Sequence, residues 1–433
     1  MNVKKMTNYT NKVKARELWK TLYLCAKESP TRRFHALYDK IYRPDILWEA
    51  WQRVRRKKGS GGIDGQTIQE IVEDYGEKKF LNELYLELKD KKYHPSPVLR
   101  TYIPKDDGKK RPLGIPTIKD RVVQMATKLV IEPIFEADFN DCSFGFRPKK
   151  NAHQAMAKIR KASKKSFWVV DVDIQGYFDN INQEKLMKLV EQRINDRRVL
   201  KLIRKWLDAG VMEEGNVRNP VTGTPQGGVI SPLLANIYLN TMDQLWEKKF
   251  NHLGEIIRYA DDFVIMCKTK QQALESIRVI QAIMGKLDLS LNTKKSKLIN
   301  IWNDIDGFDF LGFHNRKLPI RRKGRPTLYV MSHFPKREAM KRMRAKIKAF
   351  TEPRGKLQLD IRELVDGLNR RLQGFKNYYL ISSIAKKWLK RIDWYVLKRL
   401  ALFNNKKRQR NNLQGHMDEV TNQVKHSLVK LAD

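Results

Sequence analysis

Two adjacent acidic residues in a short turn between apolar runs constrain this chain more than any other feature. Residues 256–267 read IIRYADDFVIMC, so Asp261 and Asp262 interrupt residue types that favour β-strands. Two carboxylates at a turn between buried strands cannot both stay ionised unless a cation neutralises them. Mg²⁺ prefers oxygen ligands and usually binds one or two protein carboxylates together with substrate phosphates. The pattern therefore predicts a metal-binding β-hairpin.

The charge of the chain indicates a polyanionic partner. Its 433 residues include 87 Lys plus Arg against 48 Asp plus Glu, which gives a formal net charge of +39. We expect nucleic acid and no membrane, because no apolar run approaches the roughly 18 to 20 residues of a transmembrane helix. The chain also begins with mixed polar sequence, unlike the core of a signal peptide. Hydrophobic residues make up 41% of the chain, enough for a globular protein of two or three domains.

Cysteine and histidine usage argues against other kinds of site. Cys25, Cys142 and Cys267 lie too far apart in the sequence for a CxxC metal site or a disulfide framework. The eight histidines form no HExxH motif and no Cys/His cluster. We therefore expect a reducing, cytoplasmic setting and no appended zinc endonuclease.

A second acidic segment supplies a candidate for a further metal-binding carboxylate. A two-metal phosphoryl transfer needs a carboxylate from a separate segment that reaches both ions. Residues 167–179 read FWVVDVDIQGYFD, an apolar strand that ends in acids and turns into a helix. Asp171 and Asp173 share one face of that strand, because side chains alternate with a period of two. The spacing alone does not choose between them.

Two loops carry groups suited to a nucleotide. Residues 102–116 read YIPKDDGKKRPLGIP, a hairpin that would present Lys105 and Arg111 to a triphosphate or form a solvated basic loop. Residues 224–236 read TPQGGVISPLLAN, a turn running into a helix with Ser231 at the cap and Pro232 in the first turn. Gln226 beside two glycines can approach a nucleotide, although the same letters also fit a plain turn.

The N-terminal part is predicted to be basic and helical up to about residue 58. Its apolar residues recur at roughly helical spacing, for example Leu18, Leu22 and Leu24. Residues 57–65 then read KKGSGGIDG, a glycine-dense loop. Such a loop fits a lid over a nucleic-acid strand and a flexible linker equally well.

Taken together, these blocks resemble the group II intron-encoded reverse transcriptases/maturases, of the bacterial type without a zinc endonuclease domain. YADD is similar to the active-site Tyr-x-Asp-Asp of that family, and an aromatic residue five positions after an aspartate matches Asp173 and Phe178. Four further blocks follow in the family's order: SFGFRP at 143–148, NTKKSK at 292–297, FLGF at 310–313 and LNRRLQGFKNYY at 368–379. The resemblance covers about residues 50–400, and Phe375 stands where family members often have Trp.

This resemblance implies an RNA-directed DNA polymerase and assigns roles to individual residues. Asp173, Asp261 and Asp262 would hold two Mg²⁺ ions, with Mn²⁺ as a substitute. The residues implied to position the incoming dNTP are Lys105, Arg111, Phe178, Gln226 and Lys295. Phe178 would exclude a 2′-hydroxyl. Arg147 would contact the template, and Gly312 would help to position the primer end.

A basic stretch follows these motifs. Glu338 is the lone acid between Arg316 and Lys348, so this stretch is predicted to bind nucleic-acid phosphates. The residues that we assign to this contact are Arg321, Arg322, Lys336, Lys341 and Arg342. Further along, apolar residues at 361, 364, 365, 368 and 372 form a helical stripe.

The expected fold class is α+β: a right-hand polymerase with fingers and palm, followed by an all-α thumb, or maturase, domain. We expect a basic helical extension and lid loop over residues 1–62 and fingers and palm over 63–315. A basic linker and helical thumb would cover 316–403, and a polar tail or short helix 404–433.

The expected partners are an RNA template, a DNA or RNA primer, dNTPs and a structured intron RNA whose splicing and mobility the protein would assist. Two alternatives stay open. One is a purely RNA-binding maturase, which would not need three intact acids. The other is a domesticated reverse transcriptase in phage defence or DNA repair, which the sequence does not separate from an intron enzyme. The sequence gives neither the cognate RNA nor the oligomeric state.

Overall fold

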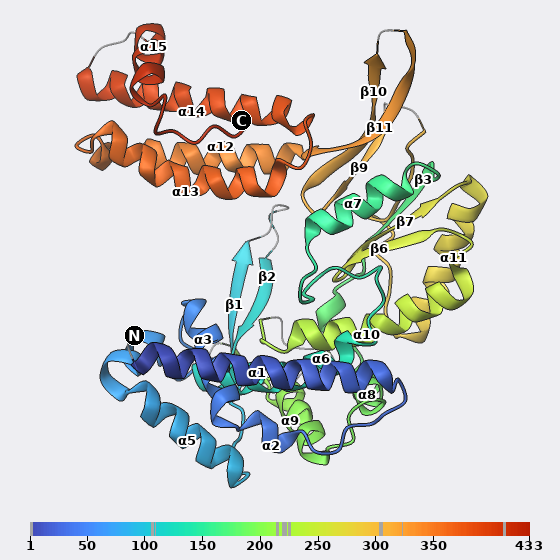
Figure 1. Ribbon diagram of the computed structural model, residues 1–433. Helices are drawn as coiled ribbons and strands as arrows, with labels where there is room; N and C mark the ends of the chain where they lie inside the picture. Colours follow the sequence, from blue (N-terminus) through green and yellow to red (C-terminus); the bar gives the residue numbers. More distant parts are fainter. Residues whose placement is uncertain are drawn as a thin grey trace. The chain divides into compact units, whose positions relative to one another are not determined.

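A computed structural model describes residues 3–104, 108, 110–213, 216–218, 223, 227–302, 306–322, 324–409 and 413–433. The chain forms two compact units, each assembled from separated stretches of sequence (Figure 1). The first unit comprises Met1–Asn151, Val172–Val264 and Leu274–Ser296, and the second comprises Ala152–Asp171, Ile265–Ala273 and Lys297–Asp433.

The first unit is mainly helical, with short strands between the helices. Its helices are α1 (Val3–Glu28), α2 (Tyr38–Ile41), α3 (Pro44–Arg56), α4 (Ile68–Glu70), α5 (Glu77–Lys89), α6 (Ile118–Glu136), α8 (Gln183–Glu191), α9 (Arg197–Asp208) and α10 (Ser231–Leu245). Short π- and 3₁₀-helical turns are η1 (Ile71–Tyr75), η2 (Tyr177–Asp179) and η3 (Trp246–Phe250).

Helix α6 forms the centre of this unit because it is apolar around most of its circumference. Most of its side chains are buried, and it packs against α1 and α3. Helix α3 contributes an apolar face with Leu47, Trp51 and Val54, as the sequence predicts. Leu22 of α1 is also buried, but Leu24 is exposed, so the predicted apolar stripe is wrong at that residue.

Two four-stranded sheets are present in the described part of the chain. The first has the order β2-β1-β4-β5, formed by β1 (Val98–Pro104), β2 (Lys110–Ile115), β4 (Val211–Glu213) and β5 (Asn216–Arg218). The second has the order β6-β7-β3-β8, formed by β3 (Trp168–Val172), β6 (Glu255–Tyr259), β7 (Asp262–Cys267) and β8 (Lys297–Asn300). The boundary between the two units passes through β3, β7 and α11 (Lys270–Lys286).

The second unit combines a three-stranded sheet, in the order β11-β10-β9, with helices. Its further elements are α7 (Ala152–Ala162), β9 (Gly307–Phe310), β10 (Phe313–Arg322), β11 (Arg325–Pro335), α12 (Arg337–Thr351), η4 (Arg354–Lys356), α13 (Ile361–Tyr379), α14 (Ala385–Arg408) and α15 (Leu413–Gln423). The predicted stripe on α13 is confirmed at Leu364, Val365, Leu368 and Leu372, which are fully buried. Membrane crossing would need a longer and more apolar helix than any in the described residues.

The structure bears on three local expectations, of which the linker and the helix cap are wrong. The stretch from 316 to 335, expected as a linker, lies in the long β10–β11 hairpin, because its residues pair across the two strands. The chain after residue 404 includes the expected short helix, α15, and Leu431 beyond it is buried. Helix α10 starts at Ser231, with Ile230 and not Ser231 at its N-cap.

The glycine-dense loop after α3 is packed against the protein and is not a free linker. Arg121 donates a hydrogen bond of 2.5 Å to the carbonyl of Ser60. A Cβ at Gly62 would lie 2.7 Å from the backbone of Thr117, so only glycine allows this approach. The loop is therefore held against the start of α6.

Candidate active site and nucleic-acid surface

The predicted hairpin is confirmed as β6 and β7, with the acidic pair at its turn. Residues on both strands are buried except at their ends, as expected for strands inside a sheet. Ala260 has a positive φ of 61°, a left-handed conformation that is uncommon for alanine and sharpens the turn. Asp261 and Asp262 follow directly, so this turn fixes where both carboxylates lie.

A buried arginine supports the turn through a hydrogen bond to its backbone. Arg258 is fully buried, and its guanidinium forms an ion pair with Asp243 of α10, with Nε 2.9 Å from Oδ1. Its Nη1 donates to the carbonyl of Ala260 at 2.8 Å and to Oδ1 of Asn236 at 3.1 Å. Sequence reasoning missed this network. The available signal was an arginine inside an apolar strand, because a buried charge needs a partner.

The segment before Arg147 packs alongside the same turn. Phe144 donates its backbone N–H to the carbonyl of Arg258, and Arg258 donates to the carbonyl of Cys142, both at 2.8 Å. A Cβ at Gly145 would lie 2.3 Å from the nitrogen of Ala260, so a larger residue would displace the turn. This part of the SFGFRP block therefore supports the hairpin itself.

Asp173 lies just after β3 and within electrostatic reach of the hairpin acids. Burial raises the pKa of Asp262 to about 6, and the carboxylates of Asp261 and Asp173 add to that shift. Burial likewise raises the pKa of Asp261, and Asp173 contributes. The mutual repulsion shows that the structure brings the three predicted acids together.

The donor set suits a hard cation. Lys295 lies with its Nζ 3.7 Å from Oδ2 of Asp173, and both side chains reach solvent. Among the described residues, no three Asp, Glu, His or Cys side chains already stand as joint ligands of one ion. Mg²⁺ does not require such a cage, because it commonly keeps waters and substrate phosphates beside one or two carboxylates. The three aspartates therefore fit the ion as partial ligands.

Arg111 on β2 is a second cation near the acids, besides Lys295. Its charge lowers the pKa of both Asp261 and Asp262, although burial and repulsion outweigh it. Arg111 is exposed and pairs through its backbone with Ile103 of β1. An exposed guanidinium in this position can bind phosphate oxygens in bidentate fashion. Lys105, predicted beside it, lies outside the described residues.

Phe178 is placed on η2, next to the loop that carries the PQGG motif. It is partly exposed, whereas its neighbour Tyr177 is buried and donates a hydrogen bond of 2.6 Å to the carbonyl of Ala235. Gly223 donates to Ile181, and a Cβ on Gly223 would lie 2.9 Å from the carbonyl of Phe178.

At the other end of that loop, Gly227 packs against β2. Its φ is 115°, and a Cβ there would lie 2.3 Å from the carbonyl of Gly114. Gln226 itself lies outside the described residues. Gly223 thus lies near Phe178, and Gly227 lies near the strand that carries Arg111.

Arg147 differs from the expectation that it contacts template. It is buried, and its guanidinium forms an ion pair of 2.8 Å with Glu136 at the end of α6. It also donates to the carbonyls of Asn140 and Ser143, at 2.6 and 2.8 Å. A guanidinium engaged in this way inside the protein stabilises the chain's own loop.

In the second unit, the predicted primer-end motif forms a tight turn between β9 and β10. Leu311 and Gly312 both have positive φ, and a Cβ on Gly312 would lie 2.8 Å from the Tyr379 hydroxyl. Tyr378 donates to the carbonyl of Leu311 at 2.8 Å, and Lys336 donates its backbone N–H to Gly312 at 3.0 Å. Two tyrosines of α13 thus hold this turn.

The predicted basic residues lie at two places in the second unit. Lys336 is the N-cap of α12, and Lys341 and Arg342 are exposed on its first turns. Arg321 is exposed near the tip of the β10–β11 hairpin. The side chain of Arg322 lies outside the described residues.

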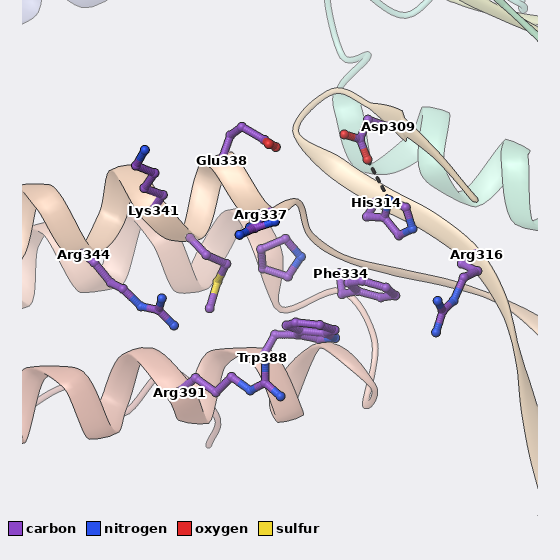
Figure 2. A pocket seen from close by; sticks show the side chains of 12 residues that line it. Asp309, His314, Arg316, Phe334, Arg337, Glu338, Lys341, Arg344, Trp388 and Arg391 are labelled. Carbon is purple, nitrogen blue, oxygen red and sulfur yellow. Dashed lines mark hydrogen bonds and ion pairs between the residues drawn. The ribbon is translucent and has the colours of Figure 1, made fainter. Parts of the chain in front are cut away.

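A cavity of about 910 Å³ lies between this hairpin and helices α12 and α14. Its lining includes Arg316, Arg337, Lys341, Arg344 and Arg391, against the acids Asp309 and Glu338. Figure 2 shows Arg344 pointing toward α14, whereas Lys341 extends away. Asp309 is already engaged by His314 at 2.7 Å, and this hydrogen bond lowers the pKa of Asp309. The excess of cations makes this cavity suited to phosphate groups.

Aromatic rings form the floor of the same cavity. Phe334 and Trp388 stack with centroids 4.9 Å apart, and the Arg391 guanidinium lies 4.7 Å from the Trp388 ring. Stacking and cation–π contact fix these side chains in place. Of the basic groups that line the cavity, Arg391 is thus held against this aromatic pair (Figure 2).

Comparison with known proteins identifies two conserved domains in the chain. Residues 103–315 match the family model described as reverse transcriptase (RNA-dependent DNA polymerase). Residues 340–420 match the model described as the maturase-specific domain of group II introns. The first match covers the candidate active site, and the second covers most of α12 to α15.

Individual proteins are similar to this chain over different parts of its length. Protein YkfC of Escherichia coli (strain K12) is 33% identical over 365 residues, covering 75% of this chain and 93% of that protein. The group II intron-encoded protein LtrA of Lactococcus lactis subsp. cremoris is 40% identical over 222 residues, covering 51% of this chain but only 36% of LtrA. Among solved structures, telomerase from Candida albicans is similar with a TM-score of 0.40 and 15% identity, over 78% of this chain and 62% of that one.

Proposed function

Because the chain belongs to the group II intron-type reverse transcriptase/maturase family and carries its RNA-directed DNA polymerase domain, we propose that it copies RNA into cDNA with Mg²⁺ held by Asp173, Asp261 and Asp262. The observation that carries this proposal is the grouping of the three acids: burial raises the pKa of Asp261 and Asp262, and repulsion from the neighbouring carboxylates adds to both shifts. A divalent cation between them would relieve that repulsion. Mn²⁺ offers the same oxygen-ligand chemistry as a substitute.

The residues around the acids have complementary tasks. When bound, the metal ions supply Lewis-acid activation of the primer 3′-hydroxyl and charge neutralisation on the leaving pyrophosphate. Arg111 would bind the triphosphate of the dNTP, and Phe178 would lie against the sugar and exclude a 2′-hydroxyl. Lys295, beside Asp173, would add a positive charge at the nucleotide. Lys105 and Gln226 join this set by family resemblance.

The duplex would be held mainly through its phosphates and 2′-hydroxyls. The deep, narrow major groove of an A-form helix keeps side chains from its bases. Lys336, Lys341, Arg342 and Arg321 offer the charges for this contact, and the Gly312 turn would position the primer end. For Arg147 we propose a structural role, because Glu136 and two carbonyls already engage its guanidinium.

Two aspartate variants test the polymerase assignment. Asp261→Ala and Asp262→Ala should abolish primer extension on an RNA template while leaving RNA affinity within about a few fold, because the ligands serve metal ions and not duplex contacts. Asp179→Ala, a nearby acid on η2, serves as the matched control and should extend primers. Near-normal extension by either hairpin variant would contradict the two-metal assignment.

A second role is assistance of group II intron splicing and mobility, which the match of residues 340–420 to the maturase domain favours. The experiment is a splicing assay on a precursor RNA encoded beside the gene, with the Asp262→Ala variant added as protein. Splicing should persist without polymerase activity, because RNA binding does not need the metal ligands. If no intron RNA structure flanks the gene, a role as a domesticated reverse transcriptase in phage defence or DNA repair replaces this one.

A further inference from the structure

The β10–β11 hairpin has two faces with different chemistry. His314 pairs opposite Phe334 and belongs to the face that lines the basic cavity of Figure 2. Lys317 pairs opposite Met331, and Pro319 opposite Tyr329. Because side chains alternate along a strand, Lys317, Met331 and Tyr329 lie on the other face. That second face has no part in the site described above.

A groove of about 770 Å³ runs along this second face, between the hairpin and helix α7. Large apolar side chains at its rim are exposed to an unusual degree: Trp302 is 64% exposed, Leu328 56% and Tyr329 48%. Phe167 lies deeper and contacts Trp302 edge to face, with centroids 4.4 Å apart. Exposed aromatic rings gathered at one groove mark a binding surface, since isolated ones would need no explanation.

The groove also contains cations that have no acidic partner. Lys317 is only 6% exposed, and its ammonium lies 4.5 Å from the Phe167 ring and 5.9 Å from the Trp302 ring. Arg160 and Lys164 reach the groove from α7 and its C-terminal end. Within the described ranges, none of the three forms an ion pair. The Nε of Arg160 is buried without a hydrogen-bond partner.

Burial lowers the pKa of Lys317, because the charged form loses hydration without gaining an anion. A bound phosphate would remove that penalty. The groove thus lacks what an anionic ligand would supply, and no Asp or Glu is among the described residues that line it.

We propose that this groove binds unpaired nucleotides of RNA, with bases stacked on Trp302 and Tyr329 and phosphates bound by Lys317, Arg160 and Lys164. Aromatic platforms beside cations are how proteins hold single strands, because every base has a π-face and every nucleotide a phosphate. A duplex cannot use such a groove, since its base faces are covered by their stacked neighbours. The inference rests on the proposed function only in taking RNA as the ligand.

Binding of a short fluorescent oligouridine and of a blunt RNA duplex, measured by anisotropy, tests the proposal. Trp302→Ala should weaken oligouridine binding by about fivefold to 150-fold, the range reported for loss of one base–aromatic stack. Lys317→Met, which keeps the side-chain stem, should weaken it too and lower its salt dependence. Duplex affinity and single-nucleotide primer extension should stay within about twofold of wild type.

A matched control is Trp394→Ala on α14, an exposed tryptophan that also has a lysine over its ring, at 5.3 Å, but lies outside the groove. Trp302→Phe should retain binding, which covers the case in which Trp302→Ala fails to fold. RNA carrying 5-iodouridine should photocrosslink to Trp302 or Tyr329 in the full-length protein.

The proposal would be overturned if Trp302→Ala, Tyr329→Ala and Lys317→Met all bound oligouridine with wild-type affinity. It would also be overturned if Trp394→Ala lost as much oligouridine affinity as Trp302→Ala. A third contrary outcome is crosslinks that map only to residues outside the groove. A wild-type chain that fails to extend primers would instead count against the proposed polymerase. The single-strand test remains valid in that case, so the two failures are distinguishable.

Discussion

Arg258 donates a hydrogen bond of 2.8 Å to the carbonyl of Ala260, the residue immediately before the two hairpin acids. The arginine is itself fixed by Asp243, and both side chains are completely buried. The guanidinium of Arg258 therefore contacts the backbone of the acidic turn. The buried ion pair of Arg258 and Asp243 therefore supports the backbone of the acidic turn.

Removal of either partner of this pair should destabilise the protein strongly. Asp243→Asn or Arg258→Met leaves one buried charge uncompensated, which costs about 3 to 5 kcal/mol. Urea unfolding monitored by circular dichroism measures the loss. The double variant should recover part of it, because no lone charge remains. Additive losses in the double-mutant cycle would show that the two side chains do not stabilise each other.

Phe178→Ala should increase ribonucleotide incorporation, because a smaller side chain leaves room for a 2′-hydroxyl. Single-nucleotide kinetics with rNTP and dNTP measure the ratio of kcat/KM values. Tyr177→Phe is the control, since Tyr177 is buried and would lose only its hydrogen bond to Ala235. An unchanged ratio in Phe178→Ala, or a changed one in Tyr177→Phe, would show that a residue other than Phe178 excludes the 2′-hydroxyl.

Replacement of Lys341 and Arg342 by Gln should weaken RNA binding and shorten cDNA products while single-nucleotide addition persists. Each lost phosphate contact should lower the slope of log K against log salt by roughly one unit. Filter binding over a salt series and product length on a long template measure the two effects. Lys248→Gln with Lys249→Gln, an exposed pair on η3, removes the same charge and should leave both values unchanged.

The stability of the second unit should fall as the pH drops below 6.5, because His333 is buried in its neutral form. Its Nδ1 lies 2.7 Å from Oδ1 of Asn315 and so must carry the proton, while its Nε2 is buried without a partner. Burial lowers the pKa of His333 to about 3, and the charge of Arg160 adds to this. The unfolded chain therefore takes up the proton first, and acid favours unfolding.

From pH 7.5 to 5, this histidine alone should remove on the order of 2 kcal/mol of stability. His333→Gln should abolish that share of the pH dependence, as measured by urea unfolding at the two pH values. Identical slopes in wild type and variant would contradict a neutral, buried His333.

The sequence by itself determined the parts of this protein that depend on residues close together in the chain. The two apolar runs on either side of Asp261 and Asp262 are enough to predict a hairpin, and the spacing of Leu364 and Leu368 predicts the buried face of a helix. The motif order also indicated the family, which the domain matches confirm. The three aspartates that we propose as metal ligands were likewise named from the sequence and its family resemblance.

Only the tertiary structure decided which charged groups stay inside the protein and which are available to a ligand. Arg147 and Arg111 are equally basic in sequence, yet Glu136 engages the first and the second remains exposed near the acids. Arg258 supports the turn and pairs with Asp243, whereas Lys317 is buried beside aromatic rings with no acidic partner among the described residues. Burial and pairing depend on residues that are distant in the chain, so no local pattern contains them.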